Sequence, residues 1–374
     1  MLHENYFKHF FELVVYYKSI NYYLIFMRLF LFQVLFCFMF VSCAIQHNAP
    51  SYSNPNRQIP PQTTIAFVDQ YGTFYPNDWS KVYGEPPRNG KKNAYSLSKL
   101  ADEKSLTSDL EKFEDQYLKS LQKHLQNRKR VFVLIHGFNA KAKSVTKNYE
   151  RIQSKLNITD SDEIIQLYWD GLYTKNPLSS LKTWFSASDY SQFAGKFALR
   201  KMLNIMSNKD VYLISHSRGA SVVLSALSSA PIDSTKMEDV IANHGIDTLS
   251  LKNDLILNKK NRIYAIALGP AIGKSDFEIK KDDSTYNVVF TSQLKSFHVT
   301  TNSTDIMLKK VIGWLSNKLN STDLGYKGDS YEDLKKTYKF LDKTDFSGQK
   351  SHDFEEYIKN PKFNDILKKY KLSK

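Results

Sequence analysis

The sequence predicts an α/β fold in which a mostly parallel central sheet is covered by helices on both faces. Two apolar runs, at residues 131–135 and 211–214, have the continuity expected of strands that are buried on both faces. Each run ends abruptly in a turn of small and polar residues, and the second turn leads into a helix-like apolar segment at residues 220–227. Buried strands that alternate with helices are typical of parallel sheets.

The turn after the second run carries the strongest chemical signal. It consists of Ser215, His216, Ser217, Arg218 and Gly219. A sharp turn from strand to helix strains its central residue, so the positions two before and two after must be small. The pattern predicts a nucleophile elbow that presents the Ser217 hydroxyl to the positive end of the next helix. Because Ser215 replaces the first glycine of the usual G-x-S-x-G pattern, a serine-rich turn between a strand and a helix remains the alternative.

The first apolar run ends in His136, Gly137, Phe138 and Asn139. A turn of this kind, one strand-helix-strand-helix interval before the nucleophile, is where an oxyanion hole is built. We expect its two donors to be the backbone N–H groups of Phe138 and Arg218. We expect His136 to order the loop by hydrogen bonding rather than to react.

Residues 135–139 (IHGFN) and 215–219 (SHSRG) together resemble the motifs of the α/β-hydrolase superfamily, on its serine esterase and lipase side. The resemblance extends from about residue 63 to the C-terminus and implies a Ser-acid-His triad in that chain order. Fold alone does not license an activity, because function belongs to the site rather than to the scaffold.

The triad acid is expected in a loop after a late strand, and Asp305 follows the strand-like residues 297–301. Asp305 could instead cap the helix expected at residues 306–315, and Asp276 and Asp283 are the fallback acids. The other expected elements are strands at residues 163–169 and 262–268, an edge strand at 63–68 and an amphipathic helix at 106–125.

The triad histidine should lie between the last strand and the last helix. His352 occupies that position, whereas His244 precedes the acid and His298 lies within a strand-like run. This imidazole would accept the Ser217 proton and later deliver it to the leaving group. A surface histidine beside a helix start is the alternative interpretation of His352.

The N-terminal residues predict where the protein works. Arg28 precedes a short apolar core at residues 29–41, and Ser42 and Cys43 follow it, which is typical of a secretory signal. We therefore expect a signal peptide at residues 1–42, with Met27 as the true start, because the core is shorter than the ~20 residues of a membrane span. Its end resembles a bacterial lipoprotein signal, which implies a diacylglycerol anchor on Cys43 in the cell envelope.

Residues 43–62 are rich in Asn, Pro, Ser and Gln and predict a flexible tether ahead of a domain at 63–374. The only cysteines are Cys37 and Cys43, so that domain contains no thiol nucleophile or disulfide. Within it, residues 170–190 cluster apolar side chains that include Trp184, and predict a lid, a wall of an acyl pocket or a loop packed on the core.

The formal net charge is +14. Such a charge suits an anionic membrane or polymer, but the scattered lysines favour a compositional bias instead. We find no nucleic-acid motif, P-loop, dinucleotide fingerprint or metal-ligand cluster, so we expect no nucleic-acid partner, cofactor or metal.

Two classes of function fit these observations. The first is a membrane-anchored serine hydrolase that cleaves an acyl or lipid ester through an acyl-enzyme. Peptidase, thioesterase and acyltransferase activities lie within this class, because the same triad serves all of them. The second is a non-catalytic envelope protein that retains the fold for binding.

Overall fold

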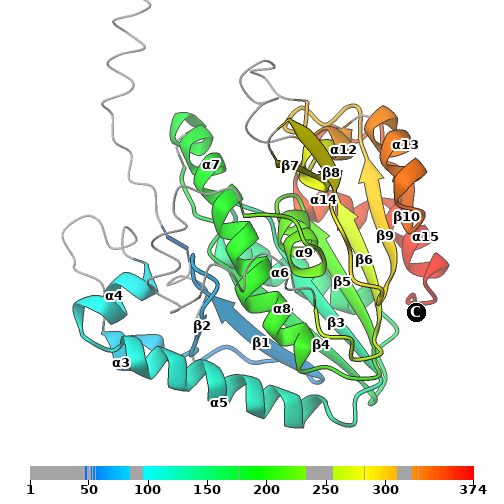
Figure 1. The fold of residues 1–374 in the computed structure, drawn as a ribbon. Helices are drawn as coiled ribbons and strands as arrows, with labels where there is room; N and C mark the ends of the chain where they lie inside the picture. Colours follow the sequence, from blue (N-terminus) through cyan, green and yellow to red (C-terminus); the bar gives the residue numbers. More distant parts are fainter. Residues whose placement is uncertain are drawn as a thin grey trace, which may run out of the picture. The chain divides into compact units, whose positions relative to one another are not determined.

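The computed structural model describes residues 47–48, 52, 54, 56–84, 96–175, 177–232, 256–281, 283–309, 322–326 and 328–374 (Figure 1). The chain divides into two units, Met1–Ala44 and Ile45–Lys374, and the described residues all lie in the second. The predicted signal peptide, Cys43 and His244 therefore lie outside the described residues. Among the helices that are described, none has the length and apolarity needed to cross a membrane.

The described residues form an eight-stranded sheet with the order β10-β9-β6-β5-β3-β4-β1-β2. Neighbouring strands are parallel, except that β2 is antiparallel to β1. The strands are β1 (Thr63–Val68), β2 (Phe74–Tyr75), β3 (Arg130–Ile135), β4 (Asp162–Trp169), β5 (Asp210–His216), β6 (Arg262–Leu268), β9 (Leu294–Thr301) and β10 (Leu341–Asp345). A separate antiparallel hairpin joins β7 (Glu278–Lys281) and β8 (Ser284–Asn287).

Helices cover both faces of the sheet because successive side chains of each strand point to opposite faces (Figure 1). Val131 and Val133 of β3 belong to one buried cluster, whereas Phe132 and Leu134 belong to the other. The helical elements that contribute to the first cluster are α5 (Thr107–Leu125), α7 (Pro177–Phe193), η1 (Ala194–Leu199), α8 (Arg200–Asn204), α9 (Gly219–Leu227), η2 (Lys274–Phe277), α12 (Asp323–Tyr326) and α13 (Gly328–Thr337). The second cluster includes α3 (Trp79–Tyr83), α4 (Leu97–Glu103), α6 (Ala142–Lys155), α14 (Phe354–Lys359) and α15 (Pro361–Lys369).

Most of the expected elements are present, but the structure differs from the predictions at several places. The strand Thr63–Val68 is not an edge strand, because β2 pairs with Phe67 and Val68. Residues 306–309 form a turn rather than the start of a helix, and residues 310–315 lie outside the described part of the chain. The sequence reasoning also missed β10, whose sequence Leu-Asp-Lys-Thr-Asp lacks the continuous apolar run of a central strand because it lies at the edge of the sheet.

Residues 170–190 are largely helical, since α7 continues through the π-helical turn η1 into α8. In the expected tether, several described residues contact the domain instead of extending freely. His47 Nδ1 lies 2.7 Å from Asp170 Oδ2, and the Asn48 amide donates to the Leu172 carbonyl at 3.0 Å. The polar composition indicated a solvated segment, but these side chains find acceptors on the loops at the carboxyl ends of the strands.

Candidate active site

The turn between β5 and α9 holds Ser217 in the left-handed region, with φ of +52°. This conformation is strained for a residue with a side chain and is found preferentially at functional sites. Two hydrogen bonds stabilise the turn: the Ser217 N–H donates to the Leu268 carbonyl at 2.9 Å, and the Ser217 carbonyl accepts from the Ala271 N–H at 3.1 Å. Both partners lie at the end of β6, so the neighbouring strand holds the elbow in place.

The two small residues that flank the elbow, Ser215 and Gly219, differ in how well the turn accommodates them. A Cβ atom on Gly219 would lie 2.6 Å from the His136 carbonyl oxygen, so only glycine is accommodated there. Ser215, which replaces the first glycine of the usual pattern, fits sterically and is 1% exposed. Its Oγ has no hydrogen-bond partner, so the substitution leaves a buried polar atom unsatisfied.

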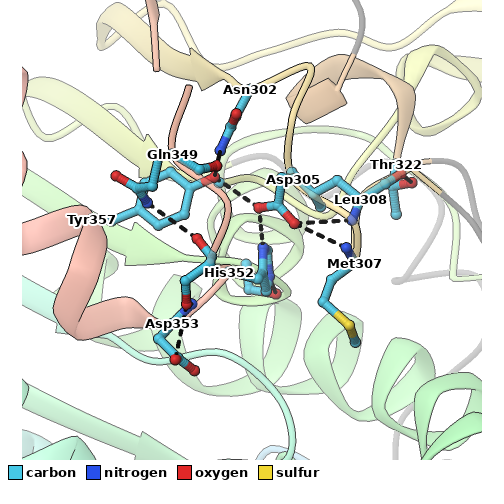
Figure 2. Close-up of polar contacts among 12 residues, drawn as sticks. Asn302, Asp305, Met307, Leu308, Thr322, Gln349, His352, Asp353 and Tyr357 are labelled. Atoms are coloured by element: carbon cyan, nitrogen blue, oxygen red, sulfur yellow. Dashed lines mark hydrogen bonds and ion pairs between the residues drawn. The ribbon is translucent and has the colours of Figure 1, made fainter. Parts of the chain in front are cut away.

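His352 lies between Ser217 and Asp305. Its Nε2 is 2.8 Å from Ser217 Oγ. Its Nδ1 is 2.6 Å from Asp305 Oδ2 (Figure 2). A carboxylate can only accept, so Nδ1 carries the proton and Nε2 is left to accept the hydrogen of the serine hydroxyl. The structure thus brings the three predicted residues together in the hydrogen-bonded order of a Ser-His-Asp triad.

Asp305 is fully buried, and each of its carboxylate oxygens is hydrogen-bonded. Oδ1 accepts from the backbone N–H groups of Met307 at 3.0 Å and Leu308 at 3.3 Å, and Oδ2 accepts from the Tyr357 hydroxyl at 2.9 Å (Figure 2). Burial alone would raise the pKa of Asp305, but the hydrogen bonds from His352, Tyr357 and Leu308 hold this pKa below its usual range. Asp305 is therefore ionised at neutral pH.

Tyr357 of α14 connects the acid to the histidine loop. Its hydroxyl accepts from the Asn302 amide at 3.2 Å, and that amide also donates to the Gln349 carbonyl at 2.8 Å (Figure 2). Burial, together with the Asp305 charge, raises the pKa of Tyr357, so it remains a donor. No role was predicted for Tyr357, and its phenol five residues after His352 was the one signal in the sequence.

His216 supports the backbone of the loop that carries His352. Its Nε2 donates to the His352 carbonyl at 2.9 Å, and its ring stacks on Phe354 with centroids 4.6 Å apart. Burial, with a smaller effect of nearby His352, lowers the pKa of His216 well below its usual value, so the ring is neutral. The sequence analysis assigned no role to His216.

His136 orders the loop after β3, which is the role expected for it. Its Nδ1 lies 2.7 Å from the Gly137 carbonyl, and its Nε2 lies 3.2 Å from the Trp169 backbone nitrogen. The Nε2 atom must accept from the Trp169 N–H, so Nδ1 carries the proton and donates to Gly137. Burial lowers the pKa of His136 to about 4, which keeps the ring neutral.

The loop ordered by His136 passes directly against the elbow. A Cβ atom on Gly137 would lie 2.8 Å from Ser217 Cβ, so this approach requires glycine. The Asn139 N–H donates to the Gly171 carbonyl at 3.0 Å, whereas the N–H groups of Phe138 and Arg218 donate to no other residue in the described part of the chain. Both groups keep an unused donor, and their role in an oxyanion hole stays a prediction.

The Arg218 side chain packs beneath α7. It is 1% exposed, and its Cζ lies 4.5 Å from the centroid of the Trp184 ring. Trp184 also contacts Phe138 edge to face, with ring centroids 4.8 Å apart. The segment at residues 170–190 thus contributes Trp184 to the surroundings of the oxyanion loop.

The fallback residues lie in other environments. Asp276 Oδ2 accepts from the Gly273 N–H at 2.7 Å, and Asp283 is exposed in the turn between β7 and β8. His298 lies within β9, where its Nε2 is 2.8 Å from Thr344 Oγ1. Within the described ranges, no group of three or more His, Cys, Asp or Glu side chains could hold a metal ion.

Residues 113–250 match a family described as "Alpha/beta hydrolase of unknown function (DUF900)". The matched residues include Phe138, Ser217 and Arg218 but end before Asp305 and His352. No curated protein matches the sequence.

Among solved structures, lipase B of Aspergillus fumigatus shares 14% sequence identity with this chain. The match covers 39% of this chain and 25% of the lipase chain, with a TM-score of 0.18. The chain thus spans about a quarter of the lipase that it matches.

Proposed function

We propose that this chain, which has the fold of the α/β hydrolases, is a serine hydrolase that cleaves carboxylic esters through an acyl-enzyme. The supporting observation is the continuous hydrogen-bonded series from Ser217 Oγ through His352 to Asp305, with distances of 2.8 and 2.6 Å. Geometry of this kind, rather than sequence position, identifies such a triad.

In the acylation step, Ser217 Oγ attacks the carbonyl carbon of the ester while its proton passes to His352 Nε2. The ionised Asp305 stabilises the imidazolium that forms. The carbonyl oxygen becomes an oxyanion that accepts hydrogen bonds from the N–H groups of Phe138 and Arg218. The bond from the carbonyl carbon to the alcohol oxygen then breaks, and His352 Nε2 returns its proton to that oxygen.

In the deacylation step, a water molecule attacks the acyl-enzyme and gives a proton to His352 Nε2. The bond from the carbonyl carbon to Ser217 Oγ breaks, and His352 protonates the serine oxygen. The carboxylic acid leaves and the enzyme returns to its starting state.

Labelling with a fluorophosphonate tests this proposal, because the probe reacts with an activated serine. We expect the wild-type protein to be labelled and the Ser217→Ala variant not to be. Ser154→Ala, which alters an exposed serine on α6, is the matched control and should be labelled like the wild type. An unlabelled wild-type protein would contradict the proposal and favour a non-catalytic binding protein.

A panel of 4-nitrophenyl esters of increasing acyl length then measures the substrate preference. The matching thioesters and anilides separate ester hydrolysis from thioesterase and peptidase activity, and added alcohol acceptors reveal acyl transfer. We expect the esters to be cleaved with the highest kcat/KM.

We further propose that a diacylglycerol on Cys43 anchors the enzyme to an envelope membrane and gives it access to acyl esters there. The supporting pattern is a basic residue, a short apolar core and a small residue directly before Cys43. Incorporation of labelled palmitate by the wild type but not by Cys43→Ser, followed by membrane fractionation, tests this anchor. Equal incorporation in both proteins would contradict it.

A further inference from the structure

The guanidinium of Arg218 is a buried charge with unused hydrogen-bonding capacity. The residue is 1% exposed, and its Nε and Nη2 atoms have no hydrogen-bond partner. Burial lowers the pKa of Arg218 to about 10, so the side chain remains charged at neutral pH. An unpaired charge in the interior is unfavourable and calls for a partner.

Neither the helix terminus nor the neighbouring indole supplies an acceptor for this cation. Arg218 caps the N-terminal end of α9, where the helix dipole already places positive partial charge and favours anions. Its cation–π contact with Trp184 provides attraction but no hydrogen-bond acceptor.

Two negative charges act on the guanidinium, those of Asp276 of the η2 turn and Asp189 of α7. Both favour the charged form of Arg218, and burial is the larger, opposing effect. Neither accepts a hydrogen bond from Nε or Nη2. These two donors therefore lack an acceptor, although the two carboxylates partly balance the charge of the guanidinium.

The unused donors of the Arg218 guanidinium belong to the residue next to the nucleophile. Arg218 directly follows Ser217, and its own N–H is one of the two free donors beside the elbow. Trp184 contacts both the guanidinium and the Phe138 ring, so one indole connects this side chain with the loop that carries the other donor.

We propose that Arg218 recognises an anionic oxygen group, a carboxylate or a phosphate, that the substrate carries a few bonds from the scissile carbonyl. The inference rests on the proposed serine hydrolase function and assigns its substrate class. A planar guanidinium matches both groups, because it can donate two parallel hydrogen bonds to neighbouring oxygens. Binding of the substrate then satisfies the donors that the free protein leaves unused.

Two pairs of matched esters test this inference and distinguish the sources of the anion. Monoethyl glutarate and ethyl pentanoate differ by a carboxylate at the end of the acyl chain. 2-(Pentanoyloxy)ethyl phosphate and 2-methoxyethyl pentanoate differ by a phosphate on the alcohol. We expect kcat/KM of the wild type to be about 10- to 100-fold higher for the anionic member of at least one pair, in line with hydrogen bonds to charged groups.

The Arg218→Met variant keeps the length of the side chain and removes its charge, and we expect it to lose this preference. Arg218→Lys retains the charge but lacks the planar guanidinium, so it should keep only part of the preference for the anionic ester. Equal kcat/KM of the wild type for both members of both pairs would overturn the inference. A preference that persists in Arg218→Met would also overturn it. The wild-type ratio decides the matter even if a variant does not fold.

A binding measurement separates failure of this inference from failure of the proposed function. Ser217→Ala should bind monoethyl glutarate or 2-(pentanoyloxy)ethyl phosphate more tightly than its neutral match, as measured by calorimetry. If the wild type is labelled by the fluorophosphonate but shows no anionic preference, only the inference fails. If it is not labelled while Ser217→Ala binds the anionic ester selectively, the hydrolase proposal fails and the anion site stands.

Discussion

A buried arginine lies at each end of α9, and the two differ in whether their N–H donors have acceptors. At the C-terminal end, Arg200 of α8 is 4% exposed and donates from Nε to the Ala226 carbonyl at 3.1 Å. Its Nη2 donates to the carbonyls of Ser225 at 2.6 Å and Ser228 at 2.7 Å. At the N-terminal end, Arg218 is just as deeply buried, but its Nε and Nη2 have no acceptor.

The helix dipole explains why only one of these arginines stabilises the fold. A cation at a helix C-terminus satisfies the last carbonyls and opposes their partial negative charge. A cation at the N-terminus meets like partial charge, and here it lies beside the strained Ser217. The C-terminal end of α9 satisfies its arginine within the fold, whereas the N-terminal end carries the anion site that we propose.

The largest effect that we expect concerns the acid that faces the N-terminal end of α9. Asp305→Asn should lower kcat by about 10³- to 10⁴-fold, because an amide neither holds the His352 tautomer nor stabilises the imidazolium. Asp353→Asn is the matched control, since Asp353 accepts from Ser351 instead of His352 and is exposed. Ester hydrolysis with thermal unfolding measures both variants. Similar activity losses in the two would contradict the assignment of Asp305.

Exchanging the two arginines for methionine tests the comparison directly. Arg200→Met should lower the free energy of unfolding by about 3 kcal/mol, because it leaves buried carbonyls without donors. Arg218→Met should leave this free energy unchanged or raise it by about 1 kcal/mol, because buried N–H donors without acceptors disappear. Denaturant titrations measure both variants, and an equal loss in the two would break the comparison.

The pH dependence of stability extends this comparison to His136, in the loop that lies against the N-terminal end of α9. Burial lowers the pKa of His136 from 6.5 to about 4, so its contribution to stability is complete above pH 6.5 and is lost as pH falls towards 4. This loss amounts to about 3 kcal/mol. Buried His216 acts in the same direction.

We therefore expect His136→Gln to lose less stability than the wild type between pH 7 and pH 4.5. Urea midpoints at the two pH values provide the measurement, and the difference between them is independent of any loss at pH 7. A pH-dependent loss as large as that of the wild type would show that His136 does not titrate in this window.

The smallest effect concerns two buried serines that flank α9. Ser215 Oγ has no partner, whereas Ser228 Oγ donates to the Leu224 carbonyl at 2.7 Å and accepts from the Ala230 N–H at 3.2 Å. Ser215→Ala should raise the free energy of unfolding by up to about 1 kcal/mol, and Ser228→Ala should lower it by about 1 kcal/mol. Changes of the same sign in both variants would contradict the contrast between the two ends.

Much of the candidate site could be predicted because its signals are local. The elbow around Ser217 and the turn that carries Phe138 each depend on steric rules that act over a few residues. Asp305 and His352 were found by their place in the chain order that the α/β-hydrolase resemblance implies. The sequence offered no comparable signal for Tyr357 or His216, because their roles depend on which loops meet at one edge of the sheet.

The sequence by itself determined the buried parallel strands, the strained turn at Ser217 and the glycine at position 219, since periodicity and steric exclusion act between near neighbours. Only the tertiary structure decided that β10 completes one edge of the sheet. Likewise, only the tertiary structure packed Asn48 against the loop after β4 and left the Arg218 guanidinium without an acceptor. Burial and hydrogen-bond satisfaction depend on segments far apart in the chain, and these become defined only when the folded elements meet.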